Sequence, residues 1–254
     1  MWMVLHGFTG APASWDPVVA ASKTLSTGLR PALLGHDGSG ADGAITFEAE
    51  VDRLLQIADA LERPRCLCGY SMGARVALGM LMTAPSAFEA AVLIGVHPGL
   101  SQESDKIARR AQDRRWSTML AEQGISTFVD AWERLPLFAS QSTADAAHRH
   151  AQREVRQSHD ALGLAQAMST LGLAEMPDYG ERIAALGIPV TLMAGALDEK
   201  FIAIARSITT SSPKANLEVV PESGHNLLVE APAAVAATLD RVETHAQHVL
   251  GSAP

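Results

Sequence analysis

The stretch LCGYSMGAR, from Leu67 to Arg75, places a glycine–any–serine–any–glycine motif around Ser71. Apolar residues precede the motif and a helical pattern follows it, so the serine is expected at a strand-to-helix turn. That is the context in which this motif forms a nucleophile elbow. The glycines at 69 and 73 leave room for the strand and the helix beside the serine, and the helix N-terminus supplies free N–H groups. The motif predicts that Ser71 projects its hydroxyl from the carboxyl edge of a sheet.

Short apolar runs alternate with helical patterns on both sides of this motif. The runs expected to be strands cover 1–5, 30–34, 65–69, 90–96, 188–195 and 215–220, and the second leads into a glycine-rich loop that reaches residue 40. The expected helices cover 14–25, 46–62, 72–85, 200–208 and 231–249. Apolar strands that alternate with helices are typical of a parallel sheet covered on both faces. The predicted fold class is therefore α/β, with a mostly parallel sheet and helices on both faces.

The alternation stops after about Pro98 and resumes after about Asp178. The sequence between them is mostly helical, poor in strands and rich in Arg, Gln and Ala. We expect residues 1–98 and 179–254 to form the α/β core, and residues 99–178 to form a helical cap inserted over the sheet.

The composition limits the classes of function. The chain has 254 residues, of which 47% are apolar and 19% charged, and no apolar run is long enough to span a membrane. The N-terminus lacks the features of a signal peptide, which favours the cytoplasm. A formal net charge of −8 argues against nonspecific nucleic-acid binding. We expect a monomer or a small homo-oligomer.

The two cysteines, Cys66 and Cys68, lie two apart in one expected strand, so both side chains point to the same face. This spacing prevents an unstrained disulfide between them, and no further ligands for a metal are evident nearby. We expect buried free thiols, and no metal site or organic cofactor.

A nucleophilic serine needs a base, and the base needs an orienting acid. In this architecture the order along the chain is Ser, Asp or Glu, then His. Asp198 and His225 each follow an expected strand and are the candidates for acid and base, although Asp198 could instead cap a helix and Glu199 is a weaker candidate for the acid. The expected oxyanion hole uses the backbone N–H groups of Phe8, in the loop HGFTG, and Met72.

The remaining histidines are weaker candidates. His97 follows a strand and could line the pocket, while His6 and His36 are expected to shape turns. His148, His150 and His159 are expected to be mostly solvated on cap helices.

The motifs LHGFTG, GHDGSG, GYSMGAR, GALDEKF and SGHN together resemble those of the α/β-hydrolase superfamily. Most members have two further strands before the one that enters HGF, so the resemblance implies a sheet shortened at its N-terminus. The segments GYSMGAR, HPGL, RRAQDRRW, FVDAWERLPLF and LDEKF are similar to those of 2-succinyl-6-hydroxy-2,4-cyclohexadiene-1-carboxylate synthases of menaquinone biosynthesis. Members of that family remove pyruvate from a ring by a 2,5-elimination and need no cofactor.

The resemblance implies a small anionic substrate with several carboxylates, which arginines would bind. The candidate binding residues are Tyr70, Arg75, Arg115, Trp132 and Arg156. Arg75 could instead lie on a helix surface, and Tyr70 and Trp132 could be core residues. Arg109, Arg110 and Arg114 are expected on a solvated helix face.

Three departures from the family pattern leave the substrate open. Leu197 stands where the family usually has an arginine, Ala74 replaces a glycine, and RQSHD after Val155 lacks the usual asparagines. The alternative function is a serine hydrolase of small esters or of carbon–carbon bonds in ring-cleavage products. A complete set of Ser71, Asp198 and His225 argues against a third alternative, a non-catalytic binding protein.

Overall fold

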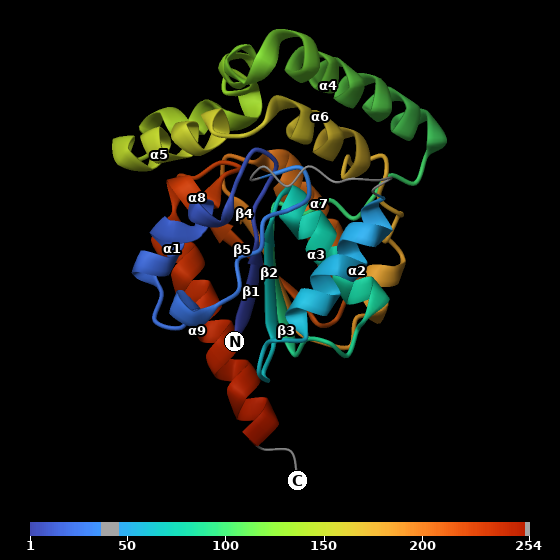
Figure 1. Ribbon diagram of the computed structural model, residues 1–254. Coiled ribbons are helices and arrows are strands. Elements are labelled where there is room, and N and C mark those ends of the chain that lie inside the picture. Colours follow the sequence, from blue (N-terminus) through green and yellow to red (C-terminus); the bar gives the residue numbers. More distant parts are fainter. Residues whose placement is uncertain (37–45, 252–254) are drawn as a thin grey trace.

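Five strands form one parallel sheet in the order β1-β2-β3-β4-β5. The computed structural model describes residues 1–36 and 46–251. The strands are β1 (Trp2–Leu5), β2 (Cys66–Tyr70), β3 (Ala90–Ile94), β4 (Val190–Gly195) and β5 (Ala215–Val220). All neighbouring pairs are parallel. The predicted fold class is confirmed, and five of the six expected strands form (Figure 1).

The prediction of a strand at 30–34 is wrong. Only an isolated bridge forms there, in which Leu29 pairs with Met3 beside β1. The Leu29 N–H donates to the Trp2 oxygen at 2.8 Å, and the Val4 N–H donates to the Leu29 oxygen at 2.9 Å. Pro31 has no N–H to continue this ladder, which explains why the pairing ends. Most of the glycine-rich loop expected after it lies outside the described residues.

Helices cover both faces of the sheet (Figure 1). Residues of α2 (Phe47–Ala58), α3 (Met72–Thr83) and α7 (Glu199–Ser211) share one hydrophobic cluster with the sheet. Residues of α1 (Asp16–Ala21) and α9 (Pro232–Gly251) belong to the cluster on the other face. The helix expected at 14–25 is shorter than predicted, because 3-10 turns at 12–15 and 25–27 flank α1.

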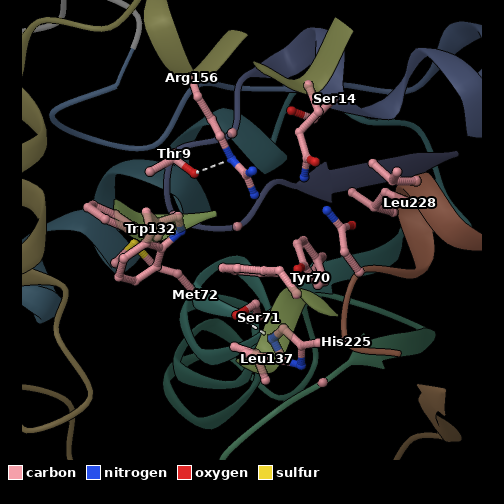
Figure 2. A pocket seen from close by; sticks show the side chains of 18 of the residues that line it. Thr9, Ser14, Tyr70, Ser71, Met72, Trp132, Leu137, Arg156, His225 and Leu228 are labelled. Carbon is pink, nitrogen blue, oxygen red and sulfur yellow. Dashed lines mark hydrogen bonds between the residues drawn. The ribbon is translucent and has the colours of Figure 1, made fainter. Parts of the chain in front are cut away.

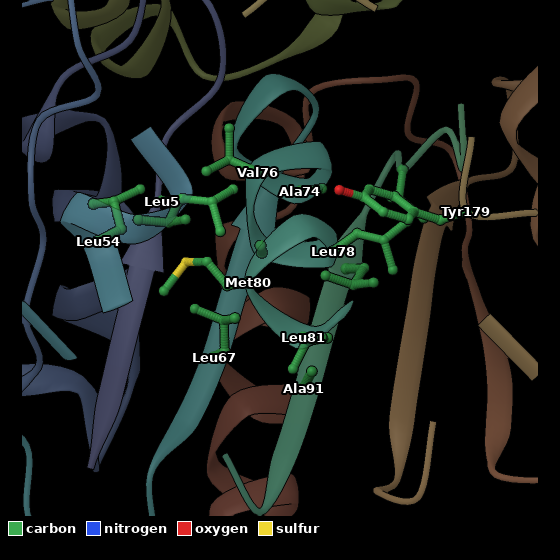
Figure 3. Packing of buried hydrophobic residues seen from close by; sticks show 14 of the residues in the cluster. Leu5, Leu54, Leu67, Ala74, Val76, Leu78, Met80, Leu81, Ala91 and Tyr179 are labelled. Carbon is green, nitrogen blue, oxygen red and sulfur yellow. The ribbon is translucent and has the colours of Figure 1, made fainter. Parts of the chain in front are cut away.

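Side chains of each strand alternate between the two clusters. On β1, Met3 and Leu5 pack toward α2 and α3, while Trp2 and Val4 pack toward α1 and α9. Figure 3 shows how Leu5 and Leu67 meet α3 in the first cluster. Cys66 and Cys68 both lie in the second cluster as free, buried thiols, which confirms the prediction for them.

A further group of helices lies over the carboxyl ends of the strands (Figure 1). They belong to residues 99–178, here called the cap segment: α4 (Glu103–Trp132), α5 (Ala146–Gln157), α6 (Ala161–Thr170) and a 3-10 helix at Pro136–Thr143. Gly124 kinks α4 with a φ of 78° and a ψ of 175°. Two further short helices lie outside the cap segment, at Arg182–Ala185 and Leu227–Glu230 (α8). None of the helices in residues 1–36 and 46–251 is long and apolar enough to cross a membrane.

Candidate active site

Ser71 occupies a strained turn between β2 and α3. Its φ of 53° and ψ of −109° are unusual for a residue with a side chain, and its N–H donates to the Ile94 oxygen at 2.8 Å. A Cβ on Gly73 would lie 2.4 Å from the backbone oxygens of Leu5 and His6. A Cβ on Gly69 would lie 2.4 Å from the oxygen of Gly73. The two glycines are therefore required for the close contact of strand and helix around the serine.

Ser71, His225 and Asp198 lie in one hydrogen-bonded row (Figure 2 shows the first pair). His225 Nε2 is 3.1 Å from Ser71 Oγ, and its Nδ1 is 2.7 Å from Asp198 Oδ2. The carboxylate of Asp198 accepts the Nδ1 proton, which leaves Nε2 to accept the serine hydroxyl. Asp198 directly precedes α7, but its side chain makes no capping hydrogen bond, so the alternative role as a helix cap is not supported.

The predicted oxyanion hole uses the backbone N–H groups of Phe8 and Met72. Met72 is the first residue of α3, and the first N–H groups of a helix have no intrahelical acceptor. Phe8 lies in a turn closed by the Gly10 N–H, which donates to the Gly7 oxygen at 3.0 Å. Phe8 and Met72 both line the cavity that contains Ser71, which suits an oxyanion hole.

The cavity above Ser71 has a volume of about 500 Å³ and lies between the sheet edge and the cap segment. Of the candidate binding residues, Tyr70, Arg75, Trp132 and Arg156 line it. The prediction that Arg115 is a substrate-binding residue is wrong, because its side chain is exposed and does not line the cavity. Arg109, expected to be solvated, lines it instead, and its Nε lies 2.8 Å from Asp113 Oδ1.

Arg75 and Arg156 are both buried and both line the cavity. Arg75 is 8% exposed and donates from Nη1 to the Leu171 oxygen at 2.7 Å. Burial lowers the pKa of Arg75 to about 9, so the guanidinium is still charged at neutral pH. Arg156 is buried, pairs with Glu133 at 3.0 Å and lies over the ring of Phe138. Burial also lowers the pKa of Arg156.

His97 also lines the cavity, as one of the sequence alternatives allowed. Burial, Lys200, Arg75 and Arg109 lower its pKa to about 4, in that order of effect. Its imidazole is therefore neutral at pH 7, and the arginines provide the positive charge on this side.

Two aromatic residues provide polar atoms and flat surfaces. The ring of Tyr70 lies 5.5 Å from that of His225, and burial raises the pKa of its hydroxyl. Trp132 stacks on Phe128 at 5.3 Å and meets Phe8 edge-on at 5.4 Å. Among the described residues, nothing accepts a hydrogen bond from the buried Trp132 Nε1.

The other histidines divide into two groups. His6 and His36 shape the loop after β1, as expected: His6 Nε2 accepts the Leu33 N–H at 3.1 Å, and His36 Nε2 accepts the Thr9 N–H at 3.2 Å. The expectation for His159 is wrong, because it is 5% exposed and its Nε2 lies 3.2 Å from the Thr9 oxygen. Sequence reasoning gave no signal for this contact. His148 is half-buried beside the cavity, and His150 is exposed as expected.

Within the residues that the structure describes, no group of three or more His, Cys, Asp or Glu side chains could hold a metal ion.

A family model of the alpha/beta hydrolase family matches residues 3–238 of the chain. The chain belongs to the alpha/beta hydrolase family. A 2-succinyl-6-hydroxy-2,4-cyclohexadiene-1-carboxylate synthase of Enterobacter sp. (strain 638) is 32% identical over 246 residues, which cover 95% of this chain and 91% of that protein.

Two solved structures have a similar fold. MenH from S. aureus superposes with a TM-score of 0.89 at 27% sequence identity, covering 97% of this chain and 94% of that one. A thermophilic esterase from Thermogutta terrifontis superposes with a TM-score of 0.79 at 24% identity, covering 96% and 89%. The second likeness shows the fold alone.

Proposed function

We propose that this chain is a 2-succinyl-6-hydroxy-2,4-cyclohexadiene-1-carboxylate synthase, a carbon–oxygen lyase of menaquinone biosynthesis. Its substrate would be 2-succinyl-5-enolpyruvyl-6-hydroxy-3-cyclohexene-1-carboxylate, from which it eliminates pyruvate. The observation that carries the proposal is the placement of Arg75, Arg109 and Arg156 around the cavity above Ser71. Binding a neutral ester does not require three guanidinium groups beside the serine. Binding a substrate with three carboxylates does require such groups. The named relative from Enterobacter supports the same substrate.

The reaction begins with a proton transfer inside the triad. His225 takes the hydroxyl proton of Ser71 across the 3.1 Å contact, and Asp198 stabilises the imidazolium. The Ser71 alkoxide then removes the proton from the ring carbon next to the succinyl carbonyl. The electron pair moves into that carbonyl, whose oxygen accepts the N–H groups of Phe8 and Met72.

When the electron pair returns, a double bond forms between the deprotonated carbon and its ring neighbour, and the existing ring double bond shifts by one position. This shift breaks the bond between the ring carbon and the enolpyruvyl oxygen. His225 gives its proton to the departing enolpyruvate, which becomes pyruvate. The serine has kept the proton from carbon, so both residues return to their starting state. No water is consumed, and the triad therefore acts as a base rather than as a covalent nucleophile.

The proposal assigns separate tasks to the two sides of the cavity. Arg75 and Arg109 would bind carboxylates on one side, and Arg156 would bind one on the other, beside Thr9. Tyr70 and Trp132 both line the cavity and would contact the ring and its substituents. Arg115 is left out because it is exposed.

The proposal includes the division of the chain into a core (1–98 and 179–254) and a cap (99–178) that closes the cavity. It also includes a cytoplasmic enzyme with a small-molecule substrate, without a cofactor, acting as a monomer or small homo-oligomer.

The test is a coupled assay of pyruvate release. The product of the preceding menaquinone enzyme is supplied, and pyruvate is followed with lactate dehydrogenase. Wild-type protein should release pyruvate far above the spontaneous rate, while Ser71→Ala and His225→Ala should lose several orders of magnitude. Release at the spontaneous rate by wild-type protein would reject the proposal, and rapid cleavage of an activated ester would then favour the hydrolase alternative.

A further inference from the structure

The turn that carries Phe8 contains a residue in an unfavourable conformation. Thr9 has a φ of 63°, although it is β-branched. With the Gly10 N–H bonded to the Gly7 oxygen, Thr9 is the third residue of a hydrogen-bonded turn, a position that favours glycine when φ is positive. Such a conformation persists only where the surroundings hold it.

Three side chains from different parts of the chain hold Thr9. His36 Nε2 accepts its N–H at 3.2 Å, Arg156 Nε donates to its Oγ1 at 3.3 Å, and His159 Nε2 donates to its oxygen at 3.2 Å. Thr9 is 2% exposed, so water does not replace these contacts. Figure 2 shows Arg156 reaching Thr9 from above the cavity.

Two of the three side chains come from the cap segment. Arg156 is in the last turn of α5, and His159 lies in the connection between α5 and α6. His159 is 5% exposed and packs edge-on against the His36 ring at 5.3 Å. It is not among the described residues that line the cavity, so it has no direct contact with a ligand there.

We propose that His159 is a positioning residue through which the cap holds Thr9, and thereby aims the Phe8 N–H at the oxyanion. The inference rests on the proposed oxyanion role of Phe8. Phe8 and Thr9 are the two central residues of one turn, so their backbone dihedral angles are coupled. If the Thr9 oxygen loses its hydrogen bond with His159, the turn can relax, and the Phe8 N–H then rotates away from the oxyanion. An N–H that is misplaced by an ångström weakens the transition state more than it weakens substrate binding.

The test compares two replacements of His159. In His159→Gln the amide nitrogen can take the place of Nε2 and donate to Thr9, whereas His159→Leu fills similar space without a donor. We expect His159→Leu to lower kcat by about 10- to 100-fold with KM little changed. His159→Gln should keep kcat within about threefold of wild type.

A double mutant tests whether the effect passes through Thr9. Thr9→Gly removes the penalty for a positive φ, so the turn no longer depends on His159. The loss from His159→Leu should therefore be several-fold smaller in the Thr9→Gly background than in wild type. Equal losses in both backgrounds would overturn the proposal, as would equal losses for the Gln and Leu variants, a change confined to KM, or unchanged kcat in His159→Leu.

A second readout separates this inference from the proposed activity. A fluorophosphonate reacts with Ser71 by forming an oxygen–phosphorus bond and expelling fluoride, while its phosphoryl oxygen uses the oxyanion hole. The rate of this labelling should be highest in wild type, lower in His159→Gln and lowest in His159→Leu. If wild-type protein releases no pyruvate yet labelling follows that order, the lyase proposal fails and the role of His159 stands.

Discussion

Arg75, on the core helix α3, donates a hydrogen bond from Nη1 to the backbone oxygen of Leu171 in the cap segment, at 2.7 Å. Leu171 directly follows α6, and a cation at the C-terminus of a helix is favourably placed. The contact joins the segment that carries Ser71 to the segment that covers it. It also fixes one end of the Arg75 fork while the side chain lines the cavity.

We predict that Arg75→Lys raises KM for the anionic substrate by about 10- to 100-fold, the equivalent of one charge-assisted hydrogen bond. A lysine has one point charge and cannot serve the Leu171 oxygen and a carboxylate with a rigid fork. Steady-state kinetics of pyruvate release measure the effect. An equal loss with a neutral activated ester would contradict the carboxylate-binding role.

Two arginines on α4 form a matched pair. Arg109 lines the cavity and Arg115 is exposed, although both belong to one helix. We predict that Arg109→Ala lowers kcat/KM for the anionic substrate by about 10-fold or more, while Arg115→Ala stays within about twofold of wild type. The two variants are compared in the pyruvate assay at one ionic strength. A larger loss in Arg115→Ala would mean that α4 is rotated relative to the structure described here.

The buried His6 makes stability depend on pH. Burial lowers its pKa to about 4, below the value of about 6.5 expected in the unfolded chain. Between about pH 6.5 and pH 4, His6 is therefore protonated in the unfolded state but neutral in the folded state. His6 therefore does not change the free energy of unfolding above about pH 6.5. It lowers the free energy of unfolding by about 3 kcal/mol as the pH falls to about 4.

Urea unfolding at a series of pH values between about 7.5 and 4 measures this effect. The free energy of unfolding should fall less steeply in His6→Asn than in wild type over this range. Parallel pH dependences of the two proteins would show that His6 binds its proton equally well in the folded and unfolded states.

Gly73 tests the close packing at the elbow. A Cβ there would lie 2.4 Å from two backbone oxygens, whereas a Cβ on Gly187 would meet no atom within 4 Å. Gly73→Ala should therefore lower the free energy of unfolding by about 1–3 kcal/mol and displace Ser71. Gly187→Ala, the matched control, should change stability by less than about 0.5 kcal/mol. Similar unfolding midpoints for both variants would show that the elbow has room for a side chain.

Features that depend on local order were predictable from the sequence. The elbow motif, the apolar strands and the order Ser71, Asp198, His225 all follow from residues that are near one another, or from the parallel-sheet rule that strand ends share an edge. The sheet has that arrangement, and the three side chains are within hydrogen-bond distance. The missing strand at 30–34 shows the limit of apolar patterning, because Pro31 ends the ladder.

Features that depend on the rotation and docking of a helix were not predictable. The run RRAQDRR places arginines on several faces of α4, so sequence alone does not decide which of Arg109, Arg110, Arg114 and Arg115 faces the cavity. His159 was missed for the same reason, since its contact with Thr9 joins residues 150 positions apart. No local pattern reports a contact of that kind.

The central claim is that Ser71 and its partners perform an elimination rather than a hydrolysis on this scaffold. The most direct measurement is the mass of the ring product formed together with pyruvate by wild-type protein, beside Ser71→Ala. For an elimination, we expect one pyruvate per ring product and a ring product whose mass is that of the substrate minus pyruvate. We expect no turnover by Ser71→Ala above the spontaneous rate. A ring product heavier by one water, or turnover that does not need Ser71, would contradict it.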